Sequence, residues 1–351
     1  NYSKDKMNQP LLSIRNLTVS FPQERGRFEA VRGVDLDLGP GRSLGIVGES
    51  GSGKSLTALS VLNLLPPASR VDQGTIQYFS QETGQVNMLT SSPRKLRHIR
   101  GNHISMIFQE PMTSLNPVYT CGDQVVEVML QHRAYSRKEA RSRAIEWFGE
   151  VELPQPERIF KSYPHELSGG QRQRVMIAMA VSCEPRLLIA DEPTTALDVT
   201  IQRSILSLLE KLRLRYGMSL IFISHDLAVV SGVADQVAVM YQGAVVEKGS
   251  RARVIGHPDN DYTRGLIACR PPLDYRPRRL QTLADFSSGL TAAPIERPTQ
   301  TRPPKTSSQA STVFSLRDLS KDFALKTNFW GQAVEKLRAL DHINLEVFQG
   351  E

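Results

Sequence analysis

The order of apolar and polar residues predicts strands and helices that alternate along most of the chain. Unbroken apolar runs at 187–190 and 106–108, and a third run close to His225, are typical of strands buried on both faces. Residues from about 110 to 175 read as helices. Buried strands of this kind are expected to lie in the parallel sheet of an α/β fold, which binds ligands at the carboxyl edge of the sheet. Helical spacing also predicts one buried helix face further on, formed by Ile201, Ile205, Leu208, Leu209 and Leu212.

A glycine-rich segment lies between the apolar run SLGIV and a helical pattern. Residues 48–55 read GESGSGKS and fit the pattern G-x-x-x-x-G-K-[ST]. Glycines let the backbone approach phosphate closely, and a helix that starts near Lys54 adds its N-terminal dipole. Lys54 is expected to reach the β- and γ-phosphates of a nucleotide, and Ser55 to bind Mg²⁺. The residues predicted to hold the nucleotide here are Gly48, Ser50, Gly51, Ser52, Gly53, Lys54 and Ser55.

Two acidic residues follow the predicted strand at 187–190. A parallel strand delivers its last residues to the edge of the sheet where α/β proteins bind ligands. Asp191 is therefore expected to bind Mg²⁺, and Glu192 to act as general base on the attacking water. Two acids after an apolar strand are more often a capped turn when they stand alone, and the phosphate loop upstream favours the catalytic interpretation.

The sequence LSGGQRQRVMIAMAVS at 167–182 predicts a second helix start able to bind an anion. Ser168 is a good N-cap, and Gly169 and Gly170, followed by Gln171, expose backbone N–H groups. Together with GESGSGKS and DEPTTALD, this segment resembles the signature of ATP-binding-cassette (ABC) ATPases. The resemblance implies a P-loop ATPase core, an N-terminal antiparallel β subdomain and a helical subdomain that carries the signature. It also implies that the signature of one domain closes on the nucleotide held by another.

The same resemblance implies roles for residues outside these motifs. Gln109 matches the glutamine that contacts Mg²⁺ or water and senses the membrane partner. His225 matches the switch histidine that contacts the γ-phosphate, and Asp198 matches the aspartate that communicates across the dimer. Phe21 is the expected platform for adenine, with Phe28 as the rival and an ordinary packed phenylalanine as the alternative. The implied cofactors are ATP and Mg²⁺.

An internal repeat predicts a duplicated domain. LSIRNLTVSF at 12–21 aligns with FSLRDLSKDF at 314–323, and AVRGVDLDLGPGR at 30–42 aligns with ALDHINLEVFQGE at 339–351. We expect a tail at 1–10, a first ABC ATPase domain at 11–270 with its helical subdomain at about 110–175, and a linker at 271–312. The start of a second domain at 313–351 would then stop before its own phosphate loop, so the chain reads as a piece of a tandem protein.

Composition supports a globular protein with a basic connecting segment. Hydrophobic residues make up 40% and charged residues 23% of the 351 residues, and no apolar run approaches the roughly 18–20 residues that a membrane span needs. The three cysteines lie far apart, which argues for a reducing compartment and against a disulfide or zinc framework. Seven of the 21 prolines fall within 270–310, and this stretch carries +4 of the net charge of +7, so a nucleic-acid partner is not expected.

Two further stretches narrow the resemblance within the ABC family. FQEPMTSLNPVYTCGDQV and HPDNDYTRGLIACRPPLDYRPRRL are similar to the ATP-binding subunits of bacterial dipeptide, oligopeptide and nickel importers, most closely to those with two ATPase domains in one chain. The implied partners are integral membrane permease subunits, a second ABC ATPase domain or a second copy, and indirectly a solute-binding protein. The implied location is the cytoplasmic face of the bacterial inner membrane, and the piece alone is expected to be a weak ATPase. The alternative is a tandem ABC protein that acts on ribosomes, which the Pro-rich linker disfavours.

Overall fold

The computed structural model describes residues 9–24, 26–109, 114–195, 197–269, 311–327 and 333–348. These residues fall into two compact units, one of which holds residues 9–269 and the other residues 311–348. The predicted tail at 1–10 and linker at 271–312 lie outside the described residues, apart from Gln9, Pro10, Ser311 and Thr312.

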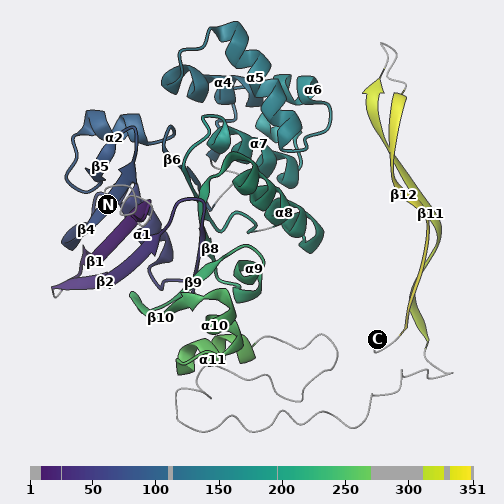
Figure 1. Ribbon diagram of the computed structural model, residues 1–351. Coiled ribbons are helices and arrows are strands. Elements are labelled where there is room, and N and C mark those ends of the chain that lie inside the picture. The colour runs from purple at the N-terminus through teal and green to yellow at the C-terminus, as the bar shows by residue number, and fades with distance from the viewer. Residues whose placement is uncertain are drawn as a thin grey trace. The chain divides into compact units, whose positions relative to one another are not determined.

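A six-stranded sheet forms the centre of the first unit (Figure 1). Its strand order is β10-β9-β3-β8-β7-β6, and all neighbours are parallel except β10, which is antiparallel to β9. The parallel sheet that the apolar runs predict is therefore present, with helices covering the face that the antiparallel sheet leaves free. The strands are β3 (Ser43–Val47), β6 (Ile104–Ile107), β7 (Leu187–Asp191), β8 (Ser219–Ser224), β9 (Gln236–Tyr241) and β10 (Ala244–Ser250).

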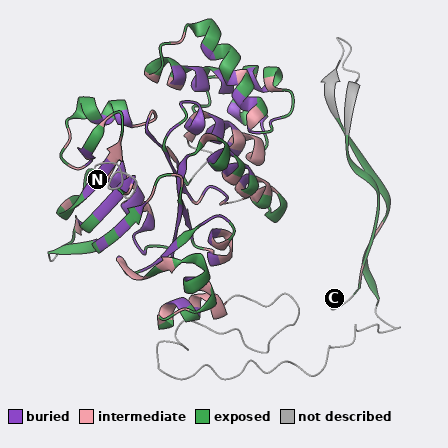
Figure 2. Ribbon diagram, in the orientation of Figure 1, coloured by how far each residue is buried: buried purple, intermediate pink, exposed green. Residues whose placement is uncertain are grey.

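Alternate residues of the central strands pack into two different hydrophobic cores, as the period of a strand requires. In β7, Leu188 and Ala190 join one core, whereas Leu187 and Ile189 join the other. All five residues of β7 are buried, which explains the unbroken apolar run in the sequence. Figure 2 shows the buried residues concentrated along these central strands.

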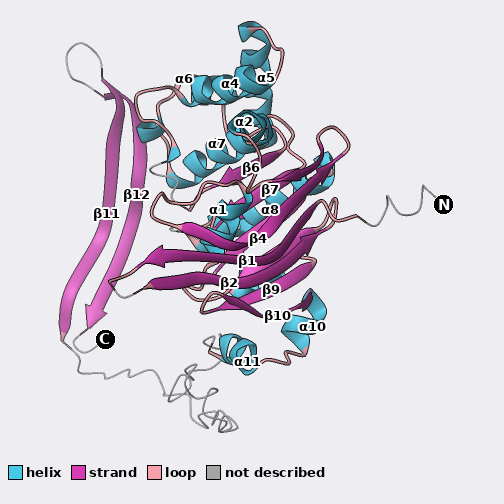
Figure 3. Cartoon of the chain, turned by 90° about the vertical axis from the view of Figure 1, so that its left-hand side faces the viewer, coloured by secondary structure: helices cyan, strands magenta, loops and turns pink. Residues whose placement is uncertain are grey.

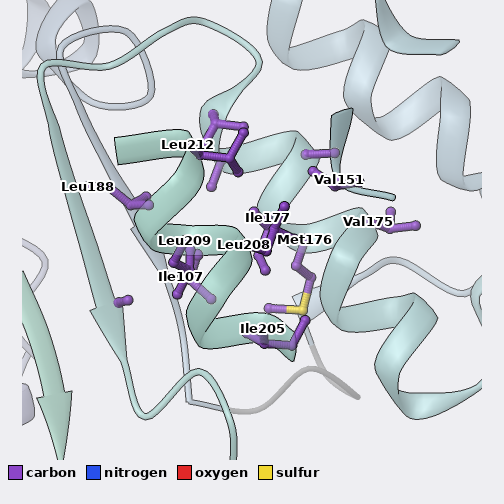
Figure 4. Packing of buried hydrophobic residues seen from close by; sticks show 14 of the residues in the cluster. Ile107, Val151, Val175, Met176, Ile177, Leu188, Ile205, Leu208, Leu209 and Leu212 are labelled. Atoms are coloured by element: carbon purple, nitrogen blue, oxygen red, sulfur yellow. The ribbon is translucent and has the colours of Figure 1, made fainter. Parts of the chain in front are cut away.

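Helices enclose the first core. Most of the face of α8 predicted from helical spacing lies inside it and packs against α7 (Figure 4). Ile205, Leu208, Leu209 and Leu212 are at most 1% exposed, whereas Ile201 is partly buried against the core. In contrast to the expectation of a strand at 106–108, β6 ends at Ile107, and Phe108 is 42% exposed because it lies beyond the last strand pairing. The helices on this side are α4 (Cys121–His132), α5 (Arg137–Glu150), α6 (Pro156–Lys161), the 3₁₀ turn η2 (Pro164–Glu166), α7 (Gly169–Val181), α8 (Val199–Tyr216), α9 (Leu227–Ser231), α10 (Arg251–Gly256) and α11 (Asp261–Ala268).

A four-stranded antiparallel sheet encloses the second core together with α1 (Figure 3). Its order is β2-β1-β4-β5. The elements are β1 (Leu12–Pro22), β2 (Arg27–Leu38), α1 (Lys54–Val61), β4 (Arg70–Ser80), β5 (Gly84–Asn87) and α2 (Pro93–Ile99). The α/β core with an N-terminal antiparallel subdomain is thus confirmed. Among the described residues, no helix is both long enough and apolar enough to cross a bilayer.

The second unit is a hairpin of β11 (Thr312–Thr327) and β12 (Ala333–Phe348) that repeats the register of β1 and β2. Ile14 pairs with Leu36 in the first hairpin, and the aligned residues Leu316 and Leu345 pair in the second. Leu17 pairs with Val34, and the aligned Leu319 pairs with Ile343. Both hairpins are irregular at the same place, between the two pairs named here. The sequence repeat is therefore also a repeat of strand pairing.

Candidate nucleotide site

The glycine-rich loop joins β3 to α1, and neighbouring backbone leaves it little room. A Cβ atom on Gly48 would lie 2.1 Å from the carbonyl oxygen of Met240, at the end of β9. Gly53 precedes α1 in the left-handed conformation, with φ of 95°, and a Cβ atom there would lie 2.6 Å from the carbonyl oxygen of Ala30. No described side chain caps the start of α1. Its first N–H groups are therefore available to a phosphate, as the motif predicts.

Lys54 is buried at the base of this loop. Its Nζ donates hydrogen bonds to the carbonyl oxygens of Gly48, at 2.8 Å, and Glu49, at 2.7 Å. Burial lowers the pKa of Lys54, while the nearby carboxylates of Glu192 and Asp191 act in the opposite direction. The side chain is thus a desolvated cation that neutral carbonyl groups hold in place. A phosphate would offer this cation a stronger acceptor.

Ser55 and Asp191 meet at the carboxyl edge of the sheet. The Ser55 hydroxyl donates to Asp191 Oδ1 at 3.1 Å, although the two residues lie 136 positions apart in the sequence. Burial raises the pKa of Asp191, and the Ser55 hydrogen bond and Lys54 offset part of that rise. A hydroxyl and a carboxylate are hard oxygen donors of the kind that Mg²⁺ takes alongside phosphate oxygens and water. This pair fits the predicted Mg²⁺ site.

Glu192 lies at the centre of a hydrogen-bonded group. Its Oε2 accepts from Gln109 Nε2 at 3.2 Å and from the Thr195 hydroxyl at 3.0 Å, and it lies 3.3 Å from Nδ1 of His225. Gln109, Glu192 and His225 follow the adjacent parallel strands β6, β7 and β8, so their meeting is a direct result of strand order. Glu192 has φ of 45°, in the left-handed region that costs a residue other than glycine about 1 kcal/mol or more. The structure thus brings together the three residues expected to act in catalysis.

The signature segment begins α7. Ser168 and Gln171 form a capping box, in which each side chain accepts a backbone N–H from the other residue, at 3.3 and 3.0 Å. Gly170 has no room for a larger residue without displacing Ile201, whose Cγ2 would lie 3.0 Å from an added Cβ atom, and Gly169 faces Leu197. Within the described part of the chain, no hydrogen bond or ion pair links residues 168–171 to Lys54, Asp191 or Glu192. The two predicted anion sites are separate within one domain.

Asp198 and Phe21, both predicted to contact the nucleotide, have positions that are compatible with more than one role. Asp198 is the N-cap of α8, where its carboxylate accepts from the N–H of Ile201 at 2.9 Å. Phe21 and Phe28 are directly paired across β1 and β2, and Phe28 is 46% exposed. Because cross-strand partners share one face of a sheet, the geometry leaves both rings as candidates for the adenine platform.

Tyr262 contacts the phosphate loop but was not expected from the sequence. Its hydroxyl oxygen accepts the backbone N–H of Glu49 at 3.2 Å, across 213 sequence positions, and its ring packs on that of Tyr241. Thr195, inside the motif DEPTTALD, was also missed as a partner of Glu192. For Thr195, the available signal was its place in the motif DEPTTALD, three residues after Glu192. Tyr262 lies in the stretch HPDNDYTRGL, whose pattern does not indicate a contact with the phosphate loop.

Comparison with known proteins agrees with this geometry. The family model described as "ABC transporter" matches residues 31–195, which include the phosphate loop, the signature and the two acids at the end of β7. The glutathione import ATP-binding protein GsiA of Escherichia coli O1:K1 / APEC is 42% identical over 353 residues, covering 97% of this chain and 55% of the relative. The chain contains an ABC transporter ATP-binding domain. The chain spans a little more than half the length of GsiA.

Other relatives and solved structures of ABC proteins extend the similarity. The peptidoglycan transport ATP-binding protein YejF of Agrobacterium fabrum is 43% identical over 349 residues, covering 99% of this chain and 58% of the relative. The dimeric post-hydrolysis structure of the ATP-binding cassette MJ0796, bound to ADP and Pi, matches with a TM-score of 0.60 and 28% identity, over 68% of this chain and 98% of that one. CbiO1 of Clostridium perfringens matches with a TM-score of 0.59 and 25% identity, over 71% of this chain and 92% of that one.

Proposed function

We propose that this ABC domain binds and hydrolyses ATP at the edge formed by the phosphate loop and the ends of β6, β7 and β8. The observation that carries the proposal is the convergence on Glu192 of Gln109, Thr195 and His225, next to the bonded pair Ser55 and Asp191. A phosphate loop alone binds nucleotide. A partly buried carboxylate that contacts three side chains would give the same edge a general base.

Each residue has a distinct task in this proposal. Lys54 transfers its hydrogen bonds from the Gly48 and Glu49 carbonyls to phosphate oxygens when ATP enters. Ser55, Asp191 and Gln109 would hold Mg²⁺, which offsets the negative charge of the phosphates when it is bound. Glu192 accepts a proton from the attacking water. His225, which is 64% exposed, would contact the γ-phosphate while it remains near Glu192.

We further propose that the signature completes a nucleotide site on a second ATP-binding domain, in a longer form of the same chain or in a second copy. Residues 168–171 form a capped helix start, and among the described residues none of them bonds to Lys54, Asp191 or Glu192 of their own domain. The hairpin at 312–348 repeats the register of β1 and β2, which supports a second domain of the same fold. One structural neighbour is described as a dimer of cassettes.

The biological role we propose is to power a bacterial importer of peptides or peptide-like solutes. GsiA is named for glutathione import and YejF for peptidoglycan transport, and glutathione is itself a small peptide. The partners would be integral membrane permease subunits at the cytoplasmic face of the inner membrane, and indirectly a solute-binding protein. The relatives named above are transport proteins, so we propose this role in place of the ribosome-acting alternative.

Replacing Glu192 by Gln in the full chain tests the hydrolytic assignment. The Glu192→Gln variant keeps the size of the side chain but loses the base, so we expect ATP hydrolysis to fall at least about 100-fold while ATP affinity stays within threefold. Glu184→Gln changes an exposed acid elsewhere and should leave both quantities unchanged. Because site completion in trans follows mass action, specific activity should rise with protein concentration. Unchanged hydrolysis in Glu192→Gln would refute the catalytic role.

A further inference from the structure

The phosphate loop is anchored from outside by a residue of α11. The N–H of Glu49, the second residue of the loop, donates to the hydroxyl oxygen of Tyr262 at 3.2 Å. The carbonyl oxygen of the same residue accepts from Lys54 Nζ. The Glu49 backbone is thus held on both sides, by the cation inside the loop and by a phenol hydroxyl outside it.

The Tyr262 ring is held firmly enough to define where its hydroxyl lies. It packs on the ring of Tyr241, with 4.3 Å between centroids. Tyr241 directly follows Met240, whose carbonyl oxygen lies against Gly48, so the aromatic pair and the loop are supported by the same strand end. Burial raises the pKa of Tyr262 to about 12, so the phenol stays neutral through the physiological range.

Hydrogen bonds fix the turn that precedes α11 to the strand β10. The carboxylate of Glu247, on β10, accepts the backbone N–H groups of Asp259 and Asn260 at 2.9 and 3.2 Å. Asn260 is the N-cap of α11, and its side chain accepts the N–H of Tyr262 itself at 2.9 Å. The position of the Tyr262 hydroxyl is therefore fixed by contacts with two strands. Its ring packs on Tyr241 at the end of β9, and its backbone is held by Asn260 next to β10.

We infer that Tyr262 is a positioning residue for the phosphate loop. Its hydroxyl holds the Glu49 amide so that the loop keeps the open form that receives phosphate, and it makes loop geometry sensitive to the position of α11. This inference rests on the proposed nucleotide site. The bonded amide belongs to the second residue of the loop and comes before Gly51 and Gly53 in the sequence. Tyr262 therefore acts through the loop and not on the phosphates.

Two conservative variants of the full chain test this assignment. Tyr262→Phe removes only the hydroxyl and keeps the ring. Tyr241→Phe removes the hydroxyl of the ring it stacks on, which accepts from Gln242 and not from the loop. We expect Tyr262→Phe to speed hydrogen exchange of the Glu49 amide, measured by NMR, and to weaken both ATP and ADP binding about two- to tenfold. Tyr241→Phe should change neither, and a cooperative thermal unfolding transition should show that both variants are folded.

The exchange measurement separates the inference from the function on which it rests. If the unmodified chain binds no ATP, the proposed function fails, while exchange at Glu49 still reports whether the loop contact exists. Unchanged Glu49 exchange in Tyr262→Phe would overturn the inference. So would faster exchange with unchanged affinity for ATP and ADP, because the contact would then be structural only.

Discussion

Replacing Lys54 by Met separates the proposed nucleotide-binding role of this residue from its contribution to the stability of the fold. Methionine keeps most of the buried chain length but offers no donor to a phosphate. In the free protein the ammonium donates to the carbonyl oxygens of Gly48 and Glu49 and, at 3.5 Å, to the Ser52 hydroxyl. In the proposed site these bonds are redirected when nucleotide binds. Charge-assisted bonds contribute about 1.5–3 kcal/mol each, so a net loss of about 2–3 kcal/mol should lower ATP affinity roughly 30- to 150-fold.

The same substitution should change the stability of the free protein little, because two effects oppose each other. The variant loses the bonds to the Gly48 and Glu49 carbonyls, at about 1 kcal/mol each. It also removes a cation whose pKa is lowered by burial. A lysine with a folded-state pKa below its ordinary 10.5 destabilises the fold at neutral pH, and this penalty disappears as the pH rises toward 10.5. We therefore expect unfolding free energies within about 1 kcal/mol of each other at pH 7.

Calorimetric titration with Mg²⁺–ATP and urea unfolding at pH 7 and pH 9 together check this reasoning. The exposed Lys211, which pairs with Glu152, provides the control variant Lys211→Met, for which ATP affinity should not change. Affinity of Lys54→Met within threefold of the unmodified chain would refute the site. A stability loss above about 3 kcal/mol would show instead that Lys54 is mainly a structural residue.

Substitutions at Gly45 and Asp198, each with a control variant, test the packing that positions the candidate site. Gly45→Ala would set a Cβ atom 2.1 Å from Val230 Cγ1, so urea unfolding should show a loss of about 1–3 kcal/mol, whereas Gly149→Ala, at an open position of α5, should be neutral or stabilising. Asp198→Ala removes the cap of α8 and should cost about 1 kcal/mol, while Asp198→Ser keeps a cap. Lower ATP hydrolysis in Asp198→Ser at unchanged stability would show a role for this carboxylate beyond capping.

The candidate site could be predicted from the sequence where its geometry depends on local spacing and strand order. The phosphate loop and the acid pair come directly after the buried strands β3 and β7, which the apolar residues of those strands predict. The helix α8 is predicted by the helical spacing of its apolar residues. Gln109, Glu192 and His225 come together because β6, β7 and β8 are neighbours in a parallel sheet. These predictions need little beyond the rule that the carboxyl ends of parallel strands share one edge.

The contacts that were missed depend on tertiary packing. Tyr262 reaches Glu49 only because Glu247 and Asn260 fix the turn before α11, and no periodic pattern in the sequence encodes that path. Phe108 continues the apolar run of β6, yet it lies beyond the last pairing with β7 and is exposed. Apolar character therefore predicted the strand but not its end, which neighbouring strands determine.

The repeated hairpin shows that equivalent hydrogen bonds can be kept by different residues. In the first hairpin Asp35 accepts the N–H of Asn16 at 2.8 Å, and in the second Asn344 accepts the N–H of Asp318 at 2.9 Å. Each member of these two pairs has exchanged a carboxylate for an amide or the reverse. The geometry has been preserved because both kinds of side chain offer an acceptor oxygen.

The two hairpins share a second pair of equivalent hydrogen bonds in the same irregular region. Thr18 accepts the N–H of Gly33 at 3.1 Å, and Ser320 accepts the N–H of His342 at 3.0 Å. Gly33 has φ of 57°, which glycine adopts freely, but His342 has φ of 49° and pays roughly 1 kcal/mol for it. The left-handed conformation is kept at the aligned position although His342 bears a cost that Gly33 does not, as expected if both hairpins are shaped to pack against a similar partner. In the first copy that partner is the core beneath β1, where Leu17 and Val34 are fully buried, whereas the aligned Leu319 and Ile343 are 40% and 41% exposed. The hairpin therefore carries the backbone geometry and the apolar face of a domain core of the same kind, which is the physical basis for proposing a second one.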